Sequence, residues 1–169
     1  MADSPEYRHE KFLRASRFVS ALPHCRVLQL TVEDVDEHGL VLRMPWQSAI
    51  VGNPATGAVH GGSLTTLMDT ACGTAVVISL PGFELCPTLD LRVDYMKSAV
   101  DQRALLARAR VVRIANQVVF VEAFVTREGD DEPIARCHAT FMRIGAFMDG
   151  HGPATAEQNS IQTSAGGDS

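Results

Sequence analysis

The stretch HGGSLTTLMDTACG, His60–Gly73, decides the fold because it opens the most apolar helix that the chain can form. Apolar residues recur at helical spacing from here to about Leu80, and a Pro-Gly pair then ends the segment. Asp69 is the only Asp, Glu, Lys or Arg between Arg43 and Glu84. The sequence therefore predicts a long buried helix that carries one carboxylate; its apolar positions are Leu64, Leu67, Met68, Ala71, Cys72, Ala75 and Val76.

Asp69 lies off that apolar stripe. At about 100° per residue, it falls in line with small or mildly polar positions, which are Gly62, Thr65, Thr66 and Gly73. Such a stripe lets another backbone approach closely or lines a cleft. The segment holds no Lys or Arg, so the partner of Asp69 must come from elsewhere in the fold, from another subunit or from a ligand. Asp69 is a candidate general base or nucleophile; the alternative is a structural or solvent-exposed carboxylate.

The tripeptide HGG marks the start of this helix. Gly61 and Gly62 fall where the first backbone N–H groups point outward and where the helix dipole favours negative charge. Glycine also lets a ligand carbonyl come close, so the N–H of Gly61 is a candidate oxyanion donor. The alternative is a plain Gly-rich helix start, in which His60 only closes the preceding loop.

The remaining segments predict one antiparallel sheet around that helix. Residues 4–23 form an amphipathic first helix, residues 26–35 and 40–46 form a hairpin, and residues 47–62 form a loop. The sheet needs a cover for its apolar face, and only the long helix is apolar enough, so the fold class is α+β. Four further strands joined by tight turns make an antiparallel meander; they cover residues 85–96, 103–114, 117–128 and 133–144.

The first strand of this meander alternates strictly. Its odd positions, which include Leu91, Val93 and Tyr95, are apolar, and its even positions are polar. Side chains alternate across a strand. We therefore expect Thr88 on the polar face, together with Asp90, Arg92 and Asp94.

Length and composition set the organisation. The chain has 169 residues, of which 46% are hydrophobic and 21% are charged. This suits one globular domain at residues 24–148, preceded by an N-terminal helix at residues 1–23. Residues 149–169 are rich in Gly, Ser, Thr and Ala and hold no aromatic residue, so we expect a disordered tail.

Charge and cysteine content limit the kinds of partner that we expect. A net charge of -5 and the lack of a basic stripe argue against nucleic acid. The longest apolar run, residues 71–80, is too short to span a bilayer, and the N-terminus shows no apolar signal-peptide core. The cysteines form no CxxC pair or ligand cluster, so we expect a cytoplasmic protein with buried, reduced thiols and with no metal; they are Cys25, Cys72, Cys86 and Cys137.

Two segments together resemble a known family. NPATGAVHGGSLTTLMDTACG, residues 53–73, followed by PTLDLRVDYMKSA, residues 87–99, is similar to the PaaI-like acyl-CoA thioesterases of the hotdog-fold superfamily. The family pattern is an Asn, a short gap, HGG, an acidic residue further along the helix, and a strand of the form T-x-D-x-x-x-x-Y. The resemblance extends from about Val27 to Ile144. It implies a hotdog fold, in which an antiparallel sheet wraps around one long central helix.

The resemblance implies a role for each matched residue. The N–H of Gly61 would polarise the thioester carbonyl, and Asp69 would act as base or nucleophile. Asn53 and His60 would orient the loop, the water or the carbonyl, although the loop between them is slightly longer than the family pattern. Thr88 would hydrogen-bond the water or the carboxylate. The site would lie between two subunits of a homodimer, or of a homotetramer of two dimers, with Asn53, His60 and Gly61 from one chain and Asp69 and Thr88 from the other.

An acyl-CoA thioester is then the expected substrate, so CoA is part of the substrate and no cofactor is implied. Candidate substrate-binding residues are Gly62, Leu64, Met68 and Phe83; candidates for the CoA phosphates are Arg92, Lys97, Arg103 and Arg113. Aromatic and medium-chain acyl groups both stay open. The alternatives are a non-catalytic acyl-CoA-binding hotdog protein and a hotdog hydratase or dehydratase, which would need an Asp that the loop before His60 lacks.

Overall fold

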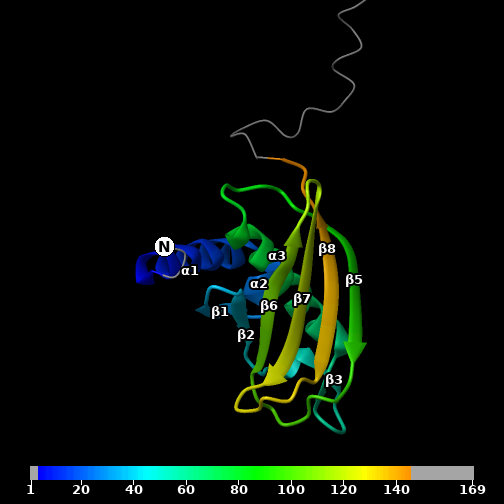
Figure 1. The fold of residues 1–169 in the computed structure, drawn as a ribbon. Helices are drawn as coiled ribbons and strands as arrows, with labels where there is room; N and C mark the ends of the chain where they lie inside the picture. The colour runs from blue at the N-terminus through cyan, green and yellow to red at the C-terminus, as the bar shows by residue number, and fades with distance from the viewer. Residues whose placement is uncertain (1–3, 146–169) are drawn as a thin grey trace, which may run out of the picture.

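The computed structural model describes residues 4–145, whose core is a six-stranded antiparallel sheet wrapped around one long helix (Figure 1). That helix, α3 (Gly61–Ser79), is the predicted apolar helix. The order of strands in the sheet is β1-β2-β6-β7-β8-β5. The α+β fold class is confirmed; the strands are β1 (Thr31–Val35), β2 (Leu40–Met44), β5 (Thr88–Tyr95), β6 (Leu105–Ile114), β7 (Val118–Arg127) and β8 (Ala135–Met142).

Helix α3 buries the face that the sequence predicted. Every predicted apolar position from Leu64 to Val76 is buried against the sheet. The buried positions of the facing strands are largely small, which lets the helix lie close to the sheet; they include Ala107, Ala109, Ala123, Ala135 and Ala139. Each large side chain removed from water contributes about 1.5–3 kcal/mol, so this contact is the main source of the fold's stability.

The predicted meander is correct for three strands and wrong for the first. Strands β6, β7 and β8 follow one another through hairpins, but β5 pairs with β8 and not with β6. Residues 96–104, which join β5 to β6, are too many for a tight turn. Strand β2 takes the place beside β6, with Leu42 opposite Ala107. Strand β5 consequently has a neighbour on one side only, and its other edge is free within residues 4–145.

The N-terminal region differs from the prediction in one element. Helix α1 (Pro5–Ala21) is confirmed, and the Ser4 hydroxyl accepts a hydrogen bond from the Tyr7 N–H at 3.2 Å as its cap. The segment after it forms a short helix, α2 (Pro23–Val27), because proline suits the first turn of a helix. The predicted strand at residues 26–35 therefore begins only at Thr31.

The predicted loop at residues 47–62 also contains regular structure. A 3-10 turn, η1 (Ser48–Ile50), leads into a small two-stranded sheet of β3 (Val51–Asn53) and β4 (Ala58–Val59). The predicted tail at residues 149–169 lies outside the described residues.

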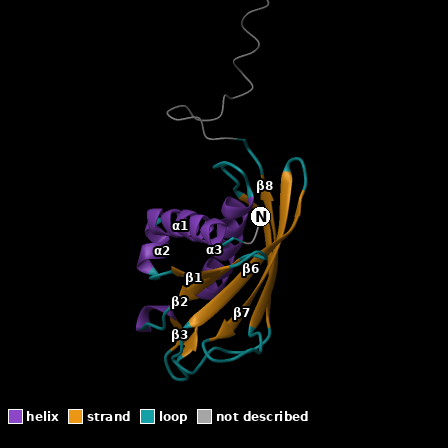
Figure 2. Cartoon of the chain, turned by 60° about the vertical axis from the view of Figure 1, so that its left-hand side comes forward, coloured by secondary structure: helices purple, strands orange, loops and turns teal. Residues whose placement is uncertain are grey.

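All the helices cover the same face of the main sheet (Figure 2). Helix α1 packs against α3 and β1, and the Arg14 side chain donates a hydrogen bond to the Leu80 carbonyl oxygen at 2.8 Å, which ties α1 to the end of α3. Within the part of the chain that the structure describes, the opposite face of the sheet carries no helix. Among residues 4–145, no helix is long and apolar enough to cross a membrane.

Candidate active site

Asp69 finds its partner in strand β5. The Thr88 hydroxyl donates a hydrogen bond to Asp69 Oδ1 at 2.8 Å. Asp69 is half-buried on α3, and neither carboxylate oxygen accepts another side-chain hydrogen bond within residues 4–145. The sequence left three sources open for this partner: the rest of the fold, another subunit or a ligand. The fold itself supplies one partner, Thr88.

A β-bulge makes this contact possible and corrects the expected orientation of Thr88. Thr88 lies opposite Phe141, whereas Asp90 lies opposite Thr140, so the register shifts between them at Leu89. Phe141 is buried on the helix side of the sheet. An extra residue in one strand reverses the alternation beyond it. Thr88 therefore points toward α3, and the prediction that it shares a face with Asp90 is wrong.

The start of α3 leaves one backbone N–H without a partner. His60 Nδ1 accepts the Gly62 N–H at 2.9 Å, and the His60 carbonyl oxygen accepts the Ser63 N–H at 3.0 Å. The N–H of Gly61 has no hydrogen-bond partner among residues 4–145. A side chain at Gly62 would place its Cβ 2.9 Å from His60 Nδ1 and disturb this cap. His60 thus holds the helix start, and within residues 4–145 the N–H of Gly61 is free to bind an oxyanion.

Tyr95 is part of this helix start and was missed as a candidate site residue. Its hydroxyl donates to the Gly61 carbonyl oxygen at 3.0 Å and lies 2.6 Å from the Thr65 hydroxyl. The Thr65 hydroxyl also lies 3.1 Å from the same carbonyl oxygen. Tyr95 therefore fixes the peptide group at the helix start. The signal was present in the sequence, since Tyr95 ends the T-x-D-x-x-x-x-Y motif on the apolar side of the strand.

Asn53 shapes the loop before the helix. Its Oδ1 accepts the Ala55 N–H at 3.0 Å, and its carbonyl oxygen accepts the Gly57 N–H at 2.8 Å. Gly57 has a φ of 72°, a left-handed conformation that favours glycine. The loop is anchored to the helix start by the His60 N–H, which donates to the Ile50 carbonyl oxygen at 2.8 Å. Within one chain, Asn53 acts on the loop and has no contact with Asp69.

A cavity of about 480 Å³ opens beside Asp69. Helix α3 contributes Thr65, Thr66 and Thr70 to its wall, and β5 contributes Thr88 and Leu91. The remaining wall comes from Leu22, Pro23, His24 and Cys25, where α1 meets α2. Gly73, which the sequence placed on the same stripe as Asp69, instead faces the Phe141 ring of β8.

The residues predicted to bind substrate are dispersed. Gly62 is exposed at the start of α3. Leu64 and Met68 are 4% and 0% exposed, because they face the sheet in the core. Phe83 lines a different cavity, between the end of α3 and α1, together with Leu13. A single chain therefore does not gather these four residues around Asp69.

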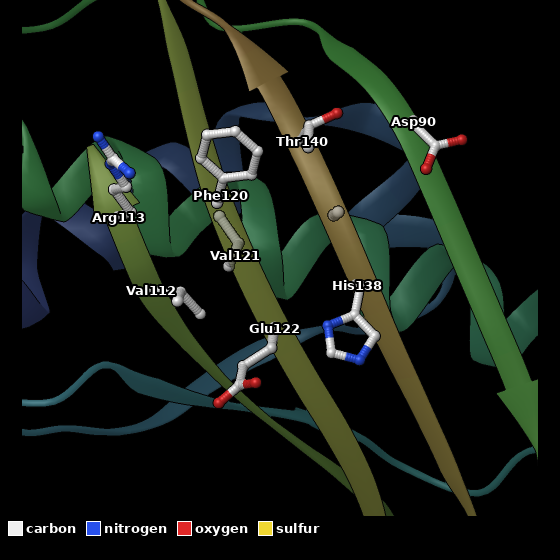
Figure 3. A pocket seen from close by; sticks show the side chains of 9 residues that line it. Asp90, Val112, Arg113, Phe120, Val121, Glu122, His138 and Thr140 are labelled. Carbon is white, nitrogen blue, oxygen red and sulfur yellow. The ribbon is translucent and has the colours of Figure 1, made fainter. Parts of the chain in front are cut away.

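The predicted basic residues are also dispersed. The Arg103 guanidinium forms two hydrogen bonds of 2.9 Å with Asp130, which hold the pKa of the Asp130 carboxyl below its ordinary value. Lys97 pairs with Glu132, and Arg92 pairs with Asp94. Arg113 lines a hollow on the sheet face that turns away from α3 (Figure 3). None of the four lines the cavity beside Asp69.

The cysteines are free thiols, and three of the four are buried as predicted. The Cys72 and Cys137 sulfurs lie 3.7 Å apart in the core, and the hydrogen bond between them, together with burial, raises the pKa of the Cys72 thiol. Cys86 is only half-buried, so the prediction of burial is wrong for that residue. In residues 4–145, no three His, Cys, Asp or Glu side chains come together in a way that could hold a metal ion.

The fold and its matched residues define a class. An antiparallel sheet around one long central helix is the hotdog fold, and the chain superimposes on solved hotdog thioesterases. A Pseudomonas aeruginosa protein of known crystal structure is 50% identical, with a TM-score of 0.72 over 79% of this chain and 98% of that one. The Escherichia coli PaaI protein has a TM-score of 0.72 at 20% identity, over 82% of this chain and 96% of that one, which shows likeness of fold alone.

Sequence comparison gives the family. The family model of the thioesterase superfamily matches residues 56–134. The chain is 30% identical over 138 residues to the medium/long-chain acyl-CoA thioesterase YigI of Salmonella typhimurium, across 74% of this chain and 88% of that protein. The chain belongs to the thioesterase superfamily, and its fold is like that of the PaaI protein.

Proposed function

We propose that this protein is an acyl-CoA thioesterase that hydrolyses its substrate to a free acid and CoA in a site shared by two chains. The observation that carries the proposal is that strand β5 contacts both residues that bear the reactive groups. Thr88, at the start of β5, contacts Asp69, and Tyr95, at its end, contacts the peptide of Gly61. The name of the YigI relative supports an acyl-CoA substrate.

The two reactive groups of one chain are too far apart for one carbonyl. Gly61 and Asp69 are separated by about 12 Å along the helix axis at 1.5 Å per residue. A carbonyl oxygen and its attacking group need contacts of about 3 Å each. The carboxylate that serves a carbonyl bound at Gly61 must therefore come from a second chain.

The free edge of β5 offers a way to bring in that chain. If two β5 strands pair antiparallel across a twofold axis, the Thr88 end of one strand lies beside the Tyr95 end of the other. Asp69 of one chain then faces Gly61 of the partner. Leu89 and Tyr95 are 55% and 53% exposed in a single chain, and such pairing would cover this edge. The minimum assembly is thus a homodimer with two equivalent sites.

Within each site the chemistry needs only these groups. The thioester carbonyl oxygen accepts the hydrogen bond of the Gly61 N–H, where the helix dipole stabilises the negative charge that develops. Asp69 removes a proton from water as the water attacks the carbonyl carbon, or attacks the carbon itself and is released by water. In both routes the carbon–sulfur bond breaks, and the CoA thiolate leaves and takes up a proton. Thr88 keeps the carboxylate oriented, and CoA enters as part of the substrate, so no cofactor takes part.

The first experiment measures CoA release from a panel of straight-chain, benzoyl and phenylacetyl thioesters. Asp69→Ala should lose at least a hundredfold in kcat, whereas Asp90→Ala, an aspartate of β5 on the opposite sheet face, should stay within twofold of the wild type. Binding of the thioesters without any CoA release would favour a non-catalytic binding protein instead. Full activity in Asp69→Ala would remove Asp69 from the mechanism.

A second experiment tests the shared site. Asp69→Ala and Gly61→Pro chains, carrying different tags, are produced together and the mixed dimer is isolated. In a shared site, one of its two sites has both defects and the other has neither, so the mixed dimer should keep about half of the wild-type activity. If each chain held a complete site, the mixed dimer would be inactive.

We also propose that two dimers associate into a tetramer through the outer face of the sheet. Val112 and Phe120 are 60% and 42% exposed there and line the hollow of Figure 3. Sedimentation should show four chains for the wild type and two for Phe120→Glu; two chains in both proteins would refute the tetramer. The free thiols suit a cytoplasmic location.

A further inference from the structure

The cavity beside Asp69 has one wall that comes from outside the matched family segment. The family model begins at residue 56, but Leu22, Pro23, His24 and Cys25 close one side of the cavity. We refer to these four residues as the α1–α2 corner. It places an N-terminal element of this chain on the same cavity as the carboxylate that the proposed reaction uses.

The α1–α2 corner is held firmly. The Arg26 side chain donates hydrogen bonds to the carbonyl oxygens of Ser20 and Ala21 at 3.0 and 3.3 Å, which fixes α2 against the end of α1. Cys25 is 2% exposed, and burial raises the pKa of its thiol. A wall built in this way has a defined position, so it can limit what fits beside Asp69.

The remaining walls offer little to a polar ligand. The hydroxyls of Thr65 and Thr66 donate to the carbonyl oxygens of Gly61 and Gly62 at 3.1 and 3.0 Å, and the Thr88 hydroxyl donates to Asp69. These three donors are used within the protein, so Thr65, Thr66 and Thr88 present no free O–H. Leu22, Pro23 and Leu91 add apolar surface. Apart from Asp69, His24 is the one exposed ionisable side chain among the residues that line this cavity.

The size of the cavity agrees with an acyl group. A volume of about 480 Å³ lies in the lower part of the range of roughly 300–1,000 Å³ for small-molecule sites. Such a space accepts an apolar acyl chain and leaves the much larger CoA outside. An acyl group whose carbonyl carbon lies at Asp69 would extend from there toward the α1–α2 corner.

We propose that the α1–α2 corner is the end wall of the acyl subsite, that this subsite takes an uncharged apolar acyl chain, and that Leu22 and His24 limit the length of that chain. The inference rests on the proposed function, because it takes Asp69 as the point where the acyl group begins. It assigns specificity to an N-terminal element and not to the matched residues 56–134.

The test compares variants over a series of straight-chain acyl-CoAs from butyryl to palmitoyl. Leu22→Trp narrows the subsite and should lower kcat/KM for the longest accepted chain at least tenfold while leaving butyryl-CoA within twofold, because the lost contacts lie at the far end. Leu22→Ala should move the preferred length upward. Leu13→Trp is the matched control, since Leu13 is on the same helix but lines a different cavity; its profile should equal that of the wild type.

Leu22 is half-buried, so His24→Trp provides a second variant at an exposed position of the same wall and should show the same length-dependent loss. If Leu22→Trp and His24→Trp are folded and change kcat/KM equally for all chain lengths, or for none, the inference is wrong. Its failure is distinguishable from failure of the proposed function. Calorimetric binding of non-hydrolysable thioether analogues of the same series reports the length preference even if the wild type releases no CoA.

Discussion

Replacing Gly61 by proline removes one backbone N–H group from the proposed site and changes little else. The N–H of Gly61 has no partner among residues 4–145, so its loss breaks no hydrogen bond of the fold. Gly61 is the first residue of α3, where proline is favoured. His60, with φ -66° and ψ 133°, already has the extended backbone that a residue before proline requires. A Cβ at this position would lie 3.4 Å from Tyr95, an ordinary contact.

The expected loss of activity follows from the lack of a substitute donor. His60 already uses the N–H groups of Gly62 and Ser63, so neither can replace that of Gly61. Removing one oxyanion donor typically lowers kcat by about 10²–10³, which corresponds to about 2.7–4 kcal/mol. Gly61→Pro should therefore lose about a hundredfold in kcat with an unchanged or slightly higher Tm.

The matched control is Gly61→Ala, which adds the same Cβ and keeps the N–H. It should retain most of the activity if the N–H is what matters. The assay is CoA release under saturating substrate, with Tm measured by thermal unfolding. A folded Gly61→Pro protein within threefold of the wild type would refute the oxyanion role, and an equal loss in Gly61→Ala would attribute the effect to added bulk.

Three further predictions follow from other contacts. Tyr95→Phe removes the hydroxyl that holds the Gly61 carbonyl oxygen. A hydrogen bond worth about 0.5–1 kcal/mol corresponds to a loss of about two- to fivefold in kcat, whereas the matched Tyr7→Phe should show no loss. Equal kinetics of the two variants would contradict the role of Tyr95. The bidentate contact with Arg143 lowers the pKa of Glu84, so its stabilisation is complete above the ordinary Glu pKa and is lost as the pH falls through the lower folded value. Glu84→Gln should therefore lower Tm by a few degrees at pH 7, and this difference should shrink as the pH falls below the ordinary Glu pKa of about 4.3; a pH-independent difference would count against the ion pair. Finally, burial raises the pKa of the Cys86 thiol and Cys25, Cys72 and Cys137 are enclosed, so a thiol reagent should modify at most Cys86 before denaturation; rapid reaction of two thiols would show that the core opens.

Periodicity alone predicted the elements whose burial is one-sided. Helix α3 and the inner faces of β6, β7 and β8 have an apolar stripe that matches one period throughout, so their type and buried residues could be read directly. The neighbours of β5 in the sheet could not be predicted from periodicity. Strand order depends on which edges the chain reaches after residues 96–104, and local sequence carries no information on that choice. Helix α2 was missed because its five residues are too few to show a period.

The candidate site was predictable in its residues and not in its geometry. Asp69 stood out because its segment is otherwise uncharged, and the family resemblance added Asn53, His60, Gly61 and Thr88. The orientation of Thr88 depends on the shift in register at Leu89, which the regular alternation of the sequence concealed. The α1–α2 corner could not be foreseen either, because its contact with the cavity joins residues far apart in the chain.

The bulge at Leu89 also bears on how this chain tolerates changes in length. Leu89 is 55% exposed, and by exposure alone it would be judged a dispensable residue. Deleting it would leave Thr88 opposite Phe141 and Asp90 opposite Thr140 in a regular ladder, so Thr88 would stay on the α3 side, within reach of Asp69. Strand β5 should therefore tolerate a one-residue deletion at this position, with both the sheet and the activity kept.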